Sequence, residues 1–517
     1  MTWESKNNAG RVCLVGAGPG DPRLITIAGL ERLQQADVVV VDALVWRRLL
    51  DHVPAYAQVI DVGKRAGQHT MNQQQINEVL LEQALADRMV VRLKGGDPYL
   101  FGRGAEEASY LARHGICVEV IPGVTAGIAA PATAGIAVTH RHMASSVIFV
   151  TGHEDPTKST SLVCYNSLAK LVEVGGTACF YMAMARLESV CAALVGGGLN
   201  DQTPAAVIQW GTLPQQRHVC GTLATIGDLV QCTGLGAPAI VVIGAVAGIE
   251  DPGLSFFSSR PLFGRCIINT RSRQQVSVLT QNLETLGAVV LEAPTLEIVR
   301  PVDDAVIDKA LSMIETVDWL ILTSVNGVAA LAERVDAGGA DARSFAKVKI
   351  AAIGSATAKA LRQQLGLRAD LVPREFEAEA LAQQMIVEHA MAGCRVLLLR
   401  ADIARPVLAD RLTAAGAKVS DLAIYCTQPS PGLPEPVLEA LRKRTVDWVT
   451  FTSSSTVTNL IGLLGEDHKL LHHTKLACIG PITSQSARDH GLQITVEAQQ
   501  HTIDGLVEAI AAWHGSG

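Results

Sequence analysis

Residues 92–107 read RLKGGDPYLFGRGAEE, which is denser in glycine and charge than an ordinary core segment. The apolar run Met89–Leu93 predicts a strand, and the glycines after it predict a tight turn at its carboxyl end. Asp97 in that turn is placed to accept a hydrogen bond from an amine or a ribose hydroxyl. Arg103 and Glu106 lie three residues apart at the start of the next predicted helix, so their side chains share one face. The stretch therefore predicts an α/β unit with a ligand-binding turn.

A similar strand, turn and helix lie near the start of the chain. Arg11–Val15 predicts a strand, and residues 16–21, GAGPGD, form the turn after it. With Asp42 at the end of the next predicted strand, the pattern is similar to a dinucleotide-binding fingerprint. The third glycine of that fingerprint is missing because Asp21 stands there, and Pro19 lacks the N–H that would face a pyrophosphate. A dinucleotide-dependent oxidoreductase stays open as the weaker alternative.

The composition favours an α/β protein of several domains. The 517 residues correspond to about three to four domains. Hydrophobic residues make up 48% of the chain and aromatic residues only 4%, which suits buried parallel strands and Ala-rich helices. The longest apolar run, at residues 236–249, is shorter than the roughly 20 residues of a membrane span. The N-terminus lacks the apolar segment of a secretory signal. We therefore expect no membrane partner.

Charge and cysteine content narrow the partners further. The net charge of −7 disfavours nonspecific binding of nucleic acid, although a local cationic cluster would still bind a small anion. The 11 cysteines are dispersed, without a CxxC pair or a Cys/His cluster. This distribution predicts a cytoplasmic protein without disulfides and without a metal site.

An aperiodic stretch and an internal repeat predict the domain organisation. Residues 250–263 are rich in Pro, Ser and Gly and predict a linker. Beyond it, Arg271 and Arg400 each follow an apolar run, and the pair Asp318-Trp319 recurs as Asp447-Trp448 at the same spacing. We therefore expect one module over residues 10–249 and a duplicated α/β module over residues 264–517.

Seven motifs of the first module together carry a resemblance to a known family. They are, in order, Val12–Asp21, Ala36–Val45, Gly63–Arg65, the stretch at 92–107, Ile121–Ala126, Gly135–Arg141 and Thr151–His153. Together they resemble uroporphyrinogen-III C-methyltransferase, of the tetrapyrrole methylase superfamily. Two departures stand out, since residues 137–143 read AVTHRHM where the family usually has PLTHRDY, and Ala105 replaces a usual glycine.

The resemblance implies a two-lobed α/β fold, with lobes at about 10–121 and 122–249, that binds S-adenosylmethionine in a trough between them. This cofactor carries no phosphate, so the objection raised by Pro19 falls away. The implied cofactor site comprises Pro19, Gly95, Gly96, Asp97, Leu100, Thr125, Ala126, Met182 and Gly211.

The same resemblance implies the catalytic positions of the first module. They are Asp42 as proton acceptor and Lys64 as proton donor, with Arg103 and Glu106 binding substrate and helping to remove a proton. The implied reaction moves a methyl group from the sulfonium sulfur to a pyrrole carbon of uroporphyrinogen III. Two turnovers would give precorrin-2, which leads to siroheme or cobalamin. The family also implies a homodimer through this module. Which residue is the base stays open.

Turns rich in Ser and Thr follow the predicted strands of the duplicated module. Hydroxyl residues of these turns are good helix N-caps, and capping is their default interpretation. Four such turns, with Arg271 and Arg400, would also line a cleft suited to carboxylates. A ligand-sensing module without catalysis is therefore an open alternative. The candidate substrate-binding residues are Arg271, Thr323, Ser324, Ser355, Arg400, Thr452, Ser453 and Thr483.

The duplicated series of strand-Arg, Asp-Trp-strand-Thr-Ser and Ile-Gly resembles uroporphyrinogen-III synthase over residues 264–517. The resemblance implies two lobes, one of 264–295 plus 429–517 and one of 301–424, joined by two extended linkers. The implied reaction cyclises hydroxymethylbilane with inversion of the last ring and needs no cofactor. Its product is the substrate of the first module. Tyr425 matches the suspected catalytic tyrosine of that family, which would act as a weak acid.

Overall fold

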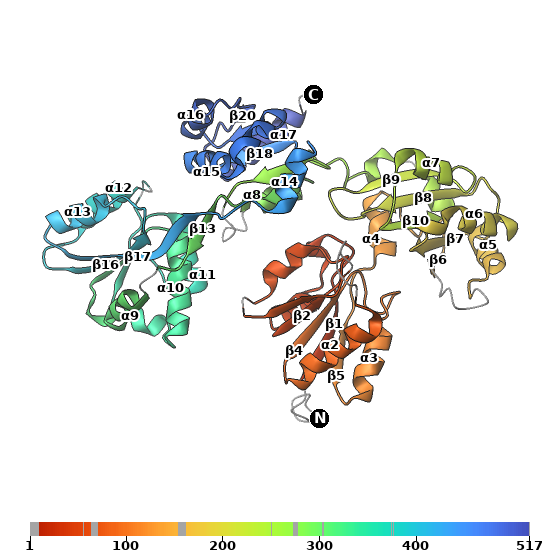
Figure 1. Cartoon of the computed structure of the whole chain (residues 1–517), viewed down its shortest axis with the longest axis horizontal. Helices are drawn as coiled ribbons and strands as arrows, with labels where there is room; N and C mark the ends of the chain where they lie inside the picture. The colour runs from red at the N-terminus through yellow and green to blue at the C-terminus, as the bar shows by residue number, and fades with distance from the viewer. Residues whose placement is uncertain are drawn as a thin grey trace. The chain divides into compact units, whose positions relative to one another are not determined.

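The computed structural model describes residues 10–54, 56–63, 71–152, 162–249, 251–271, 278–301, 304–373, 375 and 377–515. The chain divides into two units, and the first runs to Gly264 and includes Leu286–Val289. The four sheets drawn in Figure 1 are all five-stranded, and helices alternate with their strands. The predicted α/β class is therefore confirmed.

The first sheet has the order β3-β2-β4-β1-β5 and is parallel throughout. Apolar side chains cover both of its faces, as continuous runs such as Val38–Val41 require. Parallel pairing brings the carboxyl ends of all five strands to one edge, so the turns after β1 and β4 meet there. The elements are β1 (Arg11–Gly16), α1 (Ile27–Leu33), β2 (Val38–Val41), β3 (Gln58–Asp61), α2 (Gln73–Leu85), β4 (Met89–Lys94), α3 (Gly104–Arg113) and β5 (Cys117–Ile121).

Helix α2 begins differently from the sequence pattern. The sequence pattern Thr70-x-x-Gln73 predicts a capping box, and Thr70 lies outside the described residues. The observed box joins Asn72 and Gln75, because the Asn72 side chain accepts from the Gln75 N–H and the Gln75 side chain accepts from the Asn72 N–H. Asparagine is as good an N-cap as threonine or better, so the helix starts two residues later.

The second sheet is mixed, with the order β6-β7-β10-β8-β9. Only β6 and β7 pair in parallel, and the other three pairings are antiparallel. The expectation of parallel strands is wrong here, because β8 and β9 are joined by a connection too short for a crossover. The elements are α4 (Ala126–Thr133), β6 (Ser146–Thr151), α5 (Tyr165–Glu173), β7 (Gly176–Tyr181), α6 (Leu187–Gly196), β8 (Pro204–Gln209), β9 (Arg217–Thr222), α7 (Ile226–Thr233) and β10 (Ala239–Ile243).

The third sheet, of order β12-β11-β18-β19-β20, is assembled from two distant stretches of the chain. Its early strands precede the fourth sheet in sequence, and its late strands follow it. The elements are β11 (Cys266–Asn269), α8 (Val278–Thr285), β12 (Val289–Glu292), α14 (Glu435–Arg442), β18 (Trp448–Phe451), α15 (Ser454–Leu464), β19 (Lys475–Cys478), α16 (Pro481–Asp489), β20 (Val496–Glu497) and α17 (Ile503–Gly515).

The fourth sheet, of order β13-β17-β16-β14-β15, lies between these two stretches in sequence. Its long strand β17 pairs in parallel with β16, and the last residues of β17 pair antiparallel with β13. The elements are β13 (Leu296–Val299), α9 (Asp304–Ser312), β14 (Trp319–Leu322), α10 (Val325–Ala337), β15 (Lys349–Ala352), α11 (Ser355–Gln364), α12 (Ala378–Glu388), β16 (Arg395–Ala401), α13 (Val407–Ala414) and β17 (Lys418–Pro429).

The internal repeat is visible in the strand pairing of these two sheets. β14 lies between β16 and β15, and β18 lies between β11 and β19, all in parallel. Trp319 pairs with Lys349, and its counterpart Trp448 pairs with Lys475. The duplication predicted from the sequence is therefore present in the fold.

The predicted linker, residues 250–263, contains buried side chains. Phe257 and Leu262 are buried, and the Arg260 guanidinium lies 3.9 Å from the centre of the Phe257 ring. The module and lobe boundaries given above stay predictions. Among the described residues, no helix has both the length and the hydropathy to cross a bilayer. The same residues hold no group of three or more His, Cys, Asp or Glu side chains suited to a metal ion.

Candidate functional sites

Three glycine turns meet at the carboxyl edge of the first sheet. The Gly96 N–H donates to the Gly18 carbonyl at 2.7 Å, and the Gly18 N–H donates to the Gly96 carbonyl at 3.2 Å. Gly18 has φ 79° and Gly96 has φ 67°, and a positive φ favours glycine. A Cβ on Gly123, in the turn after β5, would lie 2.2 Å from the Gly96 oxygen. Only glycines allow the three backbones to approach this closely.

The Asp97 side chain joins the turns after β4 and β5 by hydrogen bonds. Its Oδ1 accepts from the backbone N–H groups of Tyr99 at 2.8 Å and Leu100 at 3.2 Å. Its Oδ2 accepts from the N–H of Gly123 at 3.0 Å. The carboxylate therefore orders the turns themselves, a role that the sequence pattern did not suggest.

Residues of the second sheet's lobe border the same turns. A Cβ on Gly96 would lie 3.9 Å from Cα of Thr125, at the start of α4. The Thr125 hydroxyl lies 2.5 Å from the Tyr181 hydroxyl, which also accepts from the Gly127 N–H at 2.7 Å. Burial raises the pKa of Tyr181. This hydroxyl therefore stays a neutral hydrogen-bonding group that joins α4 to β7.

The remaining implied cofactor residues lie around this junction. The Asp21 N–H, two residues after Pro19, donates to the Thr212 hydroxyl at 3.1 Å, next to Gly211. A Cβ on Gly211 would lie 2.2 Å from the Cβ of Ala130 in α4. Gly95 faces Leu44 across the sheet edge. Met182, directly after β7, is half-exposed with φ 54°. The turns supply carbonyls, N–H groups and a hydroxyl, which fits an amino-acid and ribose ligand such as S-adenosylmethionine.

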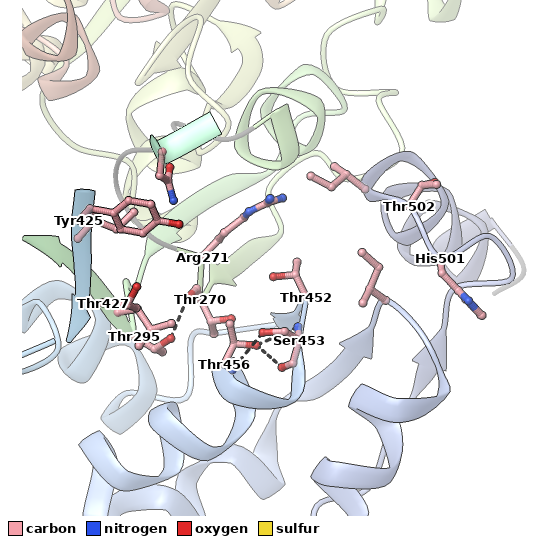
Figure 2. Close-up of a pocket in the computed structure, with 15 residues that line it drawn as sticks. Thr270, Arg271, Thr295, Tyr425, Thr427, Thr452, Ser453, Thr456, His501 and Thr502 are labelled. Atoms are coloured by element: carbon pink, nitrogen blue, oxygen red, sulfur yellow. Dashed lines mark hydrogen bonds between the residues drawn. The ribbon is translucent and has the colours of Figure 1, made fainter. Parts of the chain in front are cut away.

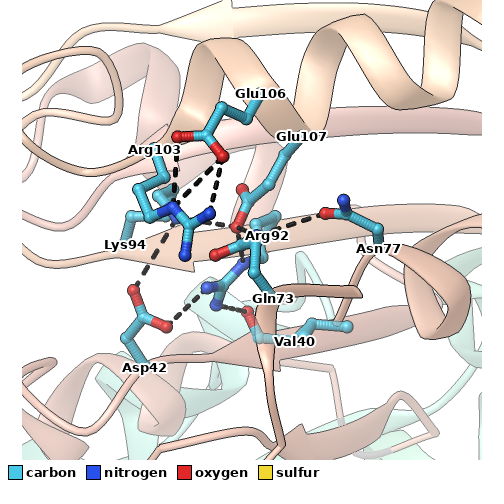
Figure 3. A network of polar contacts seen from close by, with 9 residues as sticks. All are labelled: Val40, Asp42, Gln73, Asn77, Arg92, Lys94, Arg103, Glu106 and Glu107. Atoms are coloured by element: carbon cyan, nitrogen blue, oxygen red, sulfur yellow. Dashed lines mark hydrogen bonds and ion pairs between the residues drawn. The ribbon is translucent and has the colours of Figure 1, made fainter. Parts of the chain in front are cut away.

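Asp42 lies at the end of β2 and joins a buried network of charges (Figure 3). Arg92 donates to its Oδ1 at 2.5 Å, and the Lys94 ammonium lies 3.9 Å from its Oδ2. Glu107 of α3 binds both cations through Oε1, at 2.9 Å from Lys94 Nζ and 3.3 Å from Arg92 Nε. Sequence reasoning missed all three partners. The signal was present, because Arg92 and Lys94 alternate with apolar residues and so share one face of β4.

Arg103 and Glu106 form an exposed ion pair at the start of α3, with Nη2 and Oε2 2.6 Å apart. Their side chains are 55% and 58% exposed, so both are accessible to a large substrate. The hydrogen bonds from Arg103 lower the pKa of Glu106. Arg103 has φ 58°, which turns the chain sharply into the helix. Lys64 lies outside the described residues.

A cavity of about 430 Å³ lies in the second unit, and its lining comes from both sheets of that unit (Figure 2). Hydroxyl side chains surround Arg271, whose pKa is lowered by burial. The third sheet and its turns contribute Thr270, Arg271, Thr452, Ser453, Thr456, Ile479, His501, Thr502 and Ile503, and the rest of the lining is Thr295, Leu296, Ile298, Asn326, Tyr425 and Thr427.

Tyr425 reaches this cavity from β17 and is held by Ser324. The two hydroxyl oxygens lie 3.0 Å apart. The Ser324 oxygen also accepts from the Gly327 N–H at 3.0 Å and so caps α10. The default interpretation of Ser324 as a cap and its link to the site are therefore both observed.

The structure separates the two arginines that the repeat makes equivalent. Arg271 lines the cavity, whereas Arg400 donates to both carboxylate oxygens of Asp421 at 2.5 Å each and to the carbonyl of Ala404. Thr452 and Ser453 line the cavity. The other candidates, Thr323, Ser355 and Thr483, are not among its lining residues, and Thr483 is buried in α16. Thr270, Thr295, Thr427 and His501 line it without having been singled out, since single threonines and a lone histidine carry little sequence signal.

Comparison with known proteins gives the same division. Residues 11–227 match the family model of tetrapyrrole (corrin/porphyrin) methylases, and residues 277–508 match that of uroporphyrinogen-III synthase HemD. A Ruminiclostridium josui protein named porphyrin biosynthesis protein HemD is 36% identical over 501 residues, which span 97% of both chains.

Relatives of the first half alone are closer in sequence. An S-adenosyl-L-methionine-dependent uroporphyrinogen III methyltransferase from Methanosarcina barkeri is 49% identical over 47% of this chain and 94% of its own. A uroporphyrinogen-III C-methyltransferase from Synechocystis is 50% identical over 46% of this chain and 89% of its own. The chain therefore belongs to the porphyrin-biosynthesis proteins in which a tetrapyrrole methylase domain is fused to a uroporphyrinogen-III synthase domain.

Proposed function

We propose that the chain performs two successive steps of tetrapyrrole biosynthesis. The second unit cyclises hydroxymethylbilane to uroporphyrinogen III, and the first unit methylates that product twice to give precorrin-2. The observation that carries the methyltransferase step is the meeting of the turns at Gly18, Gly96 and Gly123 beside Thr125. A homodimer through the first unit, a cytoplasmic location, the absence of nucleic-acid and membrane partners, and a synthase that works without a cofactor stay predictions.

S-adenosylmethionine supplies an electrophilic methyl group on a sulfonium sulfur when it is bound at these turns. Asp97 and the backbone around Gly96 hold the ligand so that the pyrrole carbon approaches in line. As the C–C bond forms and the S–C bond breaks, the pyrrole becomes cationic and must lose a proton. Asp42, whose side chain is 30% exposed, accepts that proton.

An apolar rim next to the turns suits the pyrrole rings of the substrate. Leu44, Tyr99, Phe101 and Met182 are large apolar residues with 38–60% of their surface exposed. The Phe101 and Tyr181 rings lie 5.0 Å apart and link this rim to the Thr125 hydroxyl. Arg103, close to the rim in sequence, would bind carboxylates of the substrate while the rim contacts its pyrrole rings.

The cavity of the second unit supports the cyclisation step. Loss of the terminal hydroxyl of hydroxymethylbilane as water needs one proton, and Tyr425 donates it from the cavity wall. The substituted carbon of the last ring attacks the cationic azafulvene that remains. The bond from that carbon to its existing bridge then breaks and re-forms at the unsubstituted carbon of the same ring, which inverts the ring and releases one proton. Arg271 and the surrounding hydroxyls bind substrate carboxylates and hold the folded chain of rings.

Analysis of the products of the full chain tests both steps. With hydroxymethylbilane alone we expect the type III isomer, and after addition of S-adenosylmethionine we expect a dimethylated product. Formation of the type I isomer only would contradict the synthase assignment and favour the ligand-sensing alternative. Thermal stabilisation by NAD and none by S-adenosylmethionine would favour the oxidoreductase alternative.

Tyr425→Phe is expected to slow formation of the type III isomer by about 100-fold, because the general acid is lost. Ring packing stays the same, so the thermal midpoint of the second unit should change little. The type I isomer should accumulate, since unassisted closure then competes. Thr474→Val is the matched control, because it also removes one hydroxyl from the second unit, and that hydroxyl donates to the Leu471 carbonyl outside the cavity. Equal rates for Tyr425→Phe and Thr474→Val would remove Tyr425 from the mechanism.

A further inference from the structure

Three charged residues are more deeply buried than charged residues usually are: Arg92 and Lys94 of β4, and Glu107 of α3. Their exposed fractions are 1%, 3% and 0%. With Asp42 they make a quartet of two cations and two anions whose formal charges cancel. Burial, and then the neighbouring Arg92, lower the pKa of Lys94. The quartet therefore sits in surroundings where each charge depends strongly on the others.

One oxygen of the quartet has no hydrogen-bond partner among the residues that the structure describes. Glu107 Oε1 accepts from Lys94, from Arg92 and, at 3.0 Å, from the Gln73 side chain. Glu107 Oε2 is buried without a hydrogen bond among the described residues. Apolar side chains of similar volume often stabilise a core as well as a buried ion cluster does. Fold stability alone therefore explains this arrangement poorly.

Both cations point at the one member of the quartet that reaches solvent. Arg92 Nη2 and Lys94 Nζ each contact a different oxygen of Asp42, at 2.5 and 3.9 Å. Arg92 also donates to the Val40 carbonyl at 3.4 Å, which fixes its guanidinium against β2 (Figure 3). The two cations of β4 thereby fix the orientation of the Asp42 carboxylate from its buried side.

We propose that Arg92, Lys94 and Glu107 form a buried positioning unit that aims the Asp42 carboxylate for proton removal and surrounds it with balanced charge. Arg92 and Lys94 hold the two oxygens, and Glu107 holds the two cations in register. None of the three contacts the substrate. The inference rests on the proposed role of Asp42 as proton acceptor and extends it to the residues behind it.

The other charged groups near Asp42 that the structure describes are paired. Arg103 and Glu106 of α3 bind each other. Asp61, at the end of the neighbouring strand β3, binds Arg47. The described charges that act directly on Asp42 are therefore the two cations of β4, with Glu107 behind them.

Charge-changing variants of the full chain test the unit through opposite shifts. Lys94→Met leaves the quartet with an excess negative charge, so the Asp42 carboxylate is protonated more easily. The acid limb of the single-turnover methylation rate should then move up by about one pH unit. Glu107→Gln leaves an excess positive charge and should move the limb to lower pH. The double variant restores neutrality, and its limb should lie near that of the wild type.

Rate and binding measurements separate positioning from folding. Lys94→Met should lower the single-turnover rate by about tenfold to a hundredfold. Its affinity for S-adenosylmethionine should stay the same, and Lys94→Arg should recover most of the rate. Glu119→Gln is the matched control, because it removes a carboxylate of the same sheet that binds Arg32 and not Asp42. It should leave rate and profile unchanged.

The outcomes distinguish this inference from the function beneath it. Full activity of Asp42→Asn would show that Asp42 is not the base and would contradict the function proposed for it. An inactive Asp42→Asn combined with an unshifted acid limb in Lys94→Met and Glu107→Gln would overturn the positioning unit alone. If a single variant fails to fold, a large rate loss in a folded Lys94→Arg protein together with a shifted acid limb in the double variant would also overturn it.

Discussion

Replacing Asp97 by alanine is expected to abolish binding of S-adenosylmethionine by the first unit. The carboxylate accepts three backbone hydrogen bonds, from Tyr99, Leu100 and Gly123, and so joins the turns after β4 and β5. Hydrogen bonds to a charged group contribute about 1.5–3 kcal/mol each, so their joint loss frees both turns. Titration calorimetry with S-adenosylmethionine on the full chain measures the effect.

A matched variant in the second unit controls for the loss of an aspartate turn as such. The Asp341 side chain also accepts from a backbone N–H two residues ahead, that of Arg343 at 2.9 Å. Asp341→Ala should leave cofactor affinity unchanged. Wild-type affinity in a folded Asp97→Ala protein would contradict the placement of the cofactor at the glycine turns.

Asp42→Asn is expected to lower the methylation rate by about 10²–10⁴-fold while S-adenosylmethionine still binds. Asparagine has the same shape and still accepts from Arg92, but it cannot take the proton that the methylated pyrrole must lose. A single-turnover assay with saturating substrate measures the chemical step without product release.

The amino end of the same strand provides the control for this variant. Asp37 immediately precedes β2 and accepts from the Met89 N–H at 2.8 Å. Asp37→Asn makes the same chemical change at the opposite edge of the sheet and should leave the methylation rate unchanged. A rate loss confined to Asp42→Asn would assign the effect to the carboxyl edge. Equal losses in both variants would contradict the role of Asp42.

Local patterns were enough to predict most strands of the first unit and the repeat of the second. The apolar runs of β1, β2 and β4 are contiguous in sequence, as are the glycine turns after β1 and β4, so short-range rules apply. Strand direction in the second sheet was not predictable in the same way. It depends on which distant strand pairs with which, and β9 has only exposed and half-buried residues, with little apolar signal.

The candidate sites show the same limit at single residues. Arg271 and Arg400 occupy equivalent places in the repeat, yet Asp421 of β17 binds only Arg400. Arg92 and Lys94 carry charges that usually indicate solvent, and pairing with Asp42 and with Glu107 of a later helix makes their burial tolerable. Ser324 and Tyr425 are far apart in sequence and meet only in the folded unit. Each of these environments is created by a long-range contact, which a local pattern does not contain.

The split construction of the third sheet also sets an order of events on the ribosome. β11 leaves the exit tunnel early, but its neighbour β18 is made only after the whole of β13–β17. At about 5–20 residues per second, the intervening chain takes roughly 10–40 s to synthesise. By the end of that time all strands of the fourth sheet have been synthesised. β11 and β12 still lack β18, the central strand of the third sheet. The cavity that both sheets line therefore comes into existence last, after synthesis has passed β19 and reached α17.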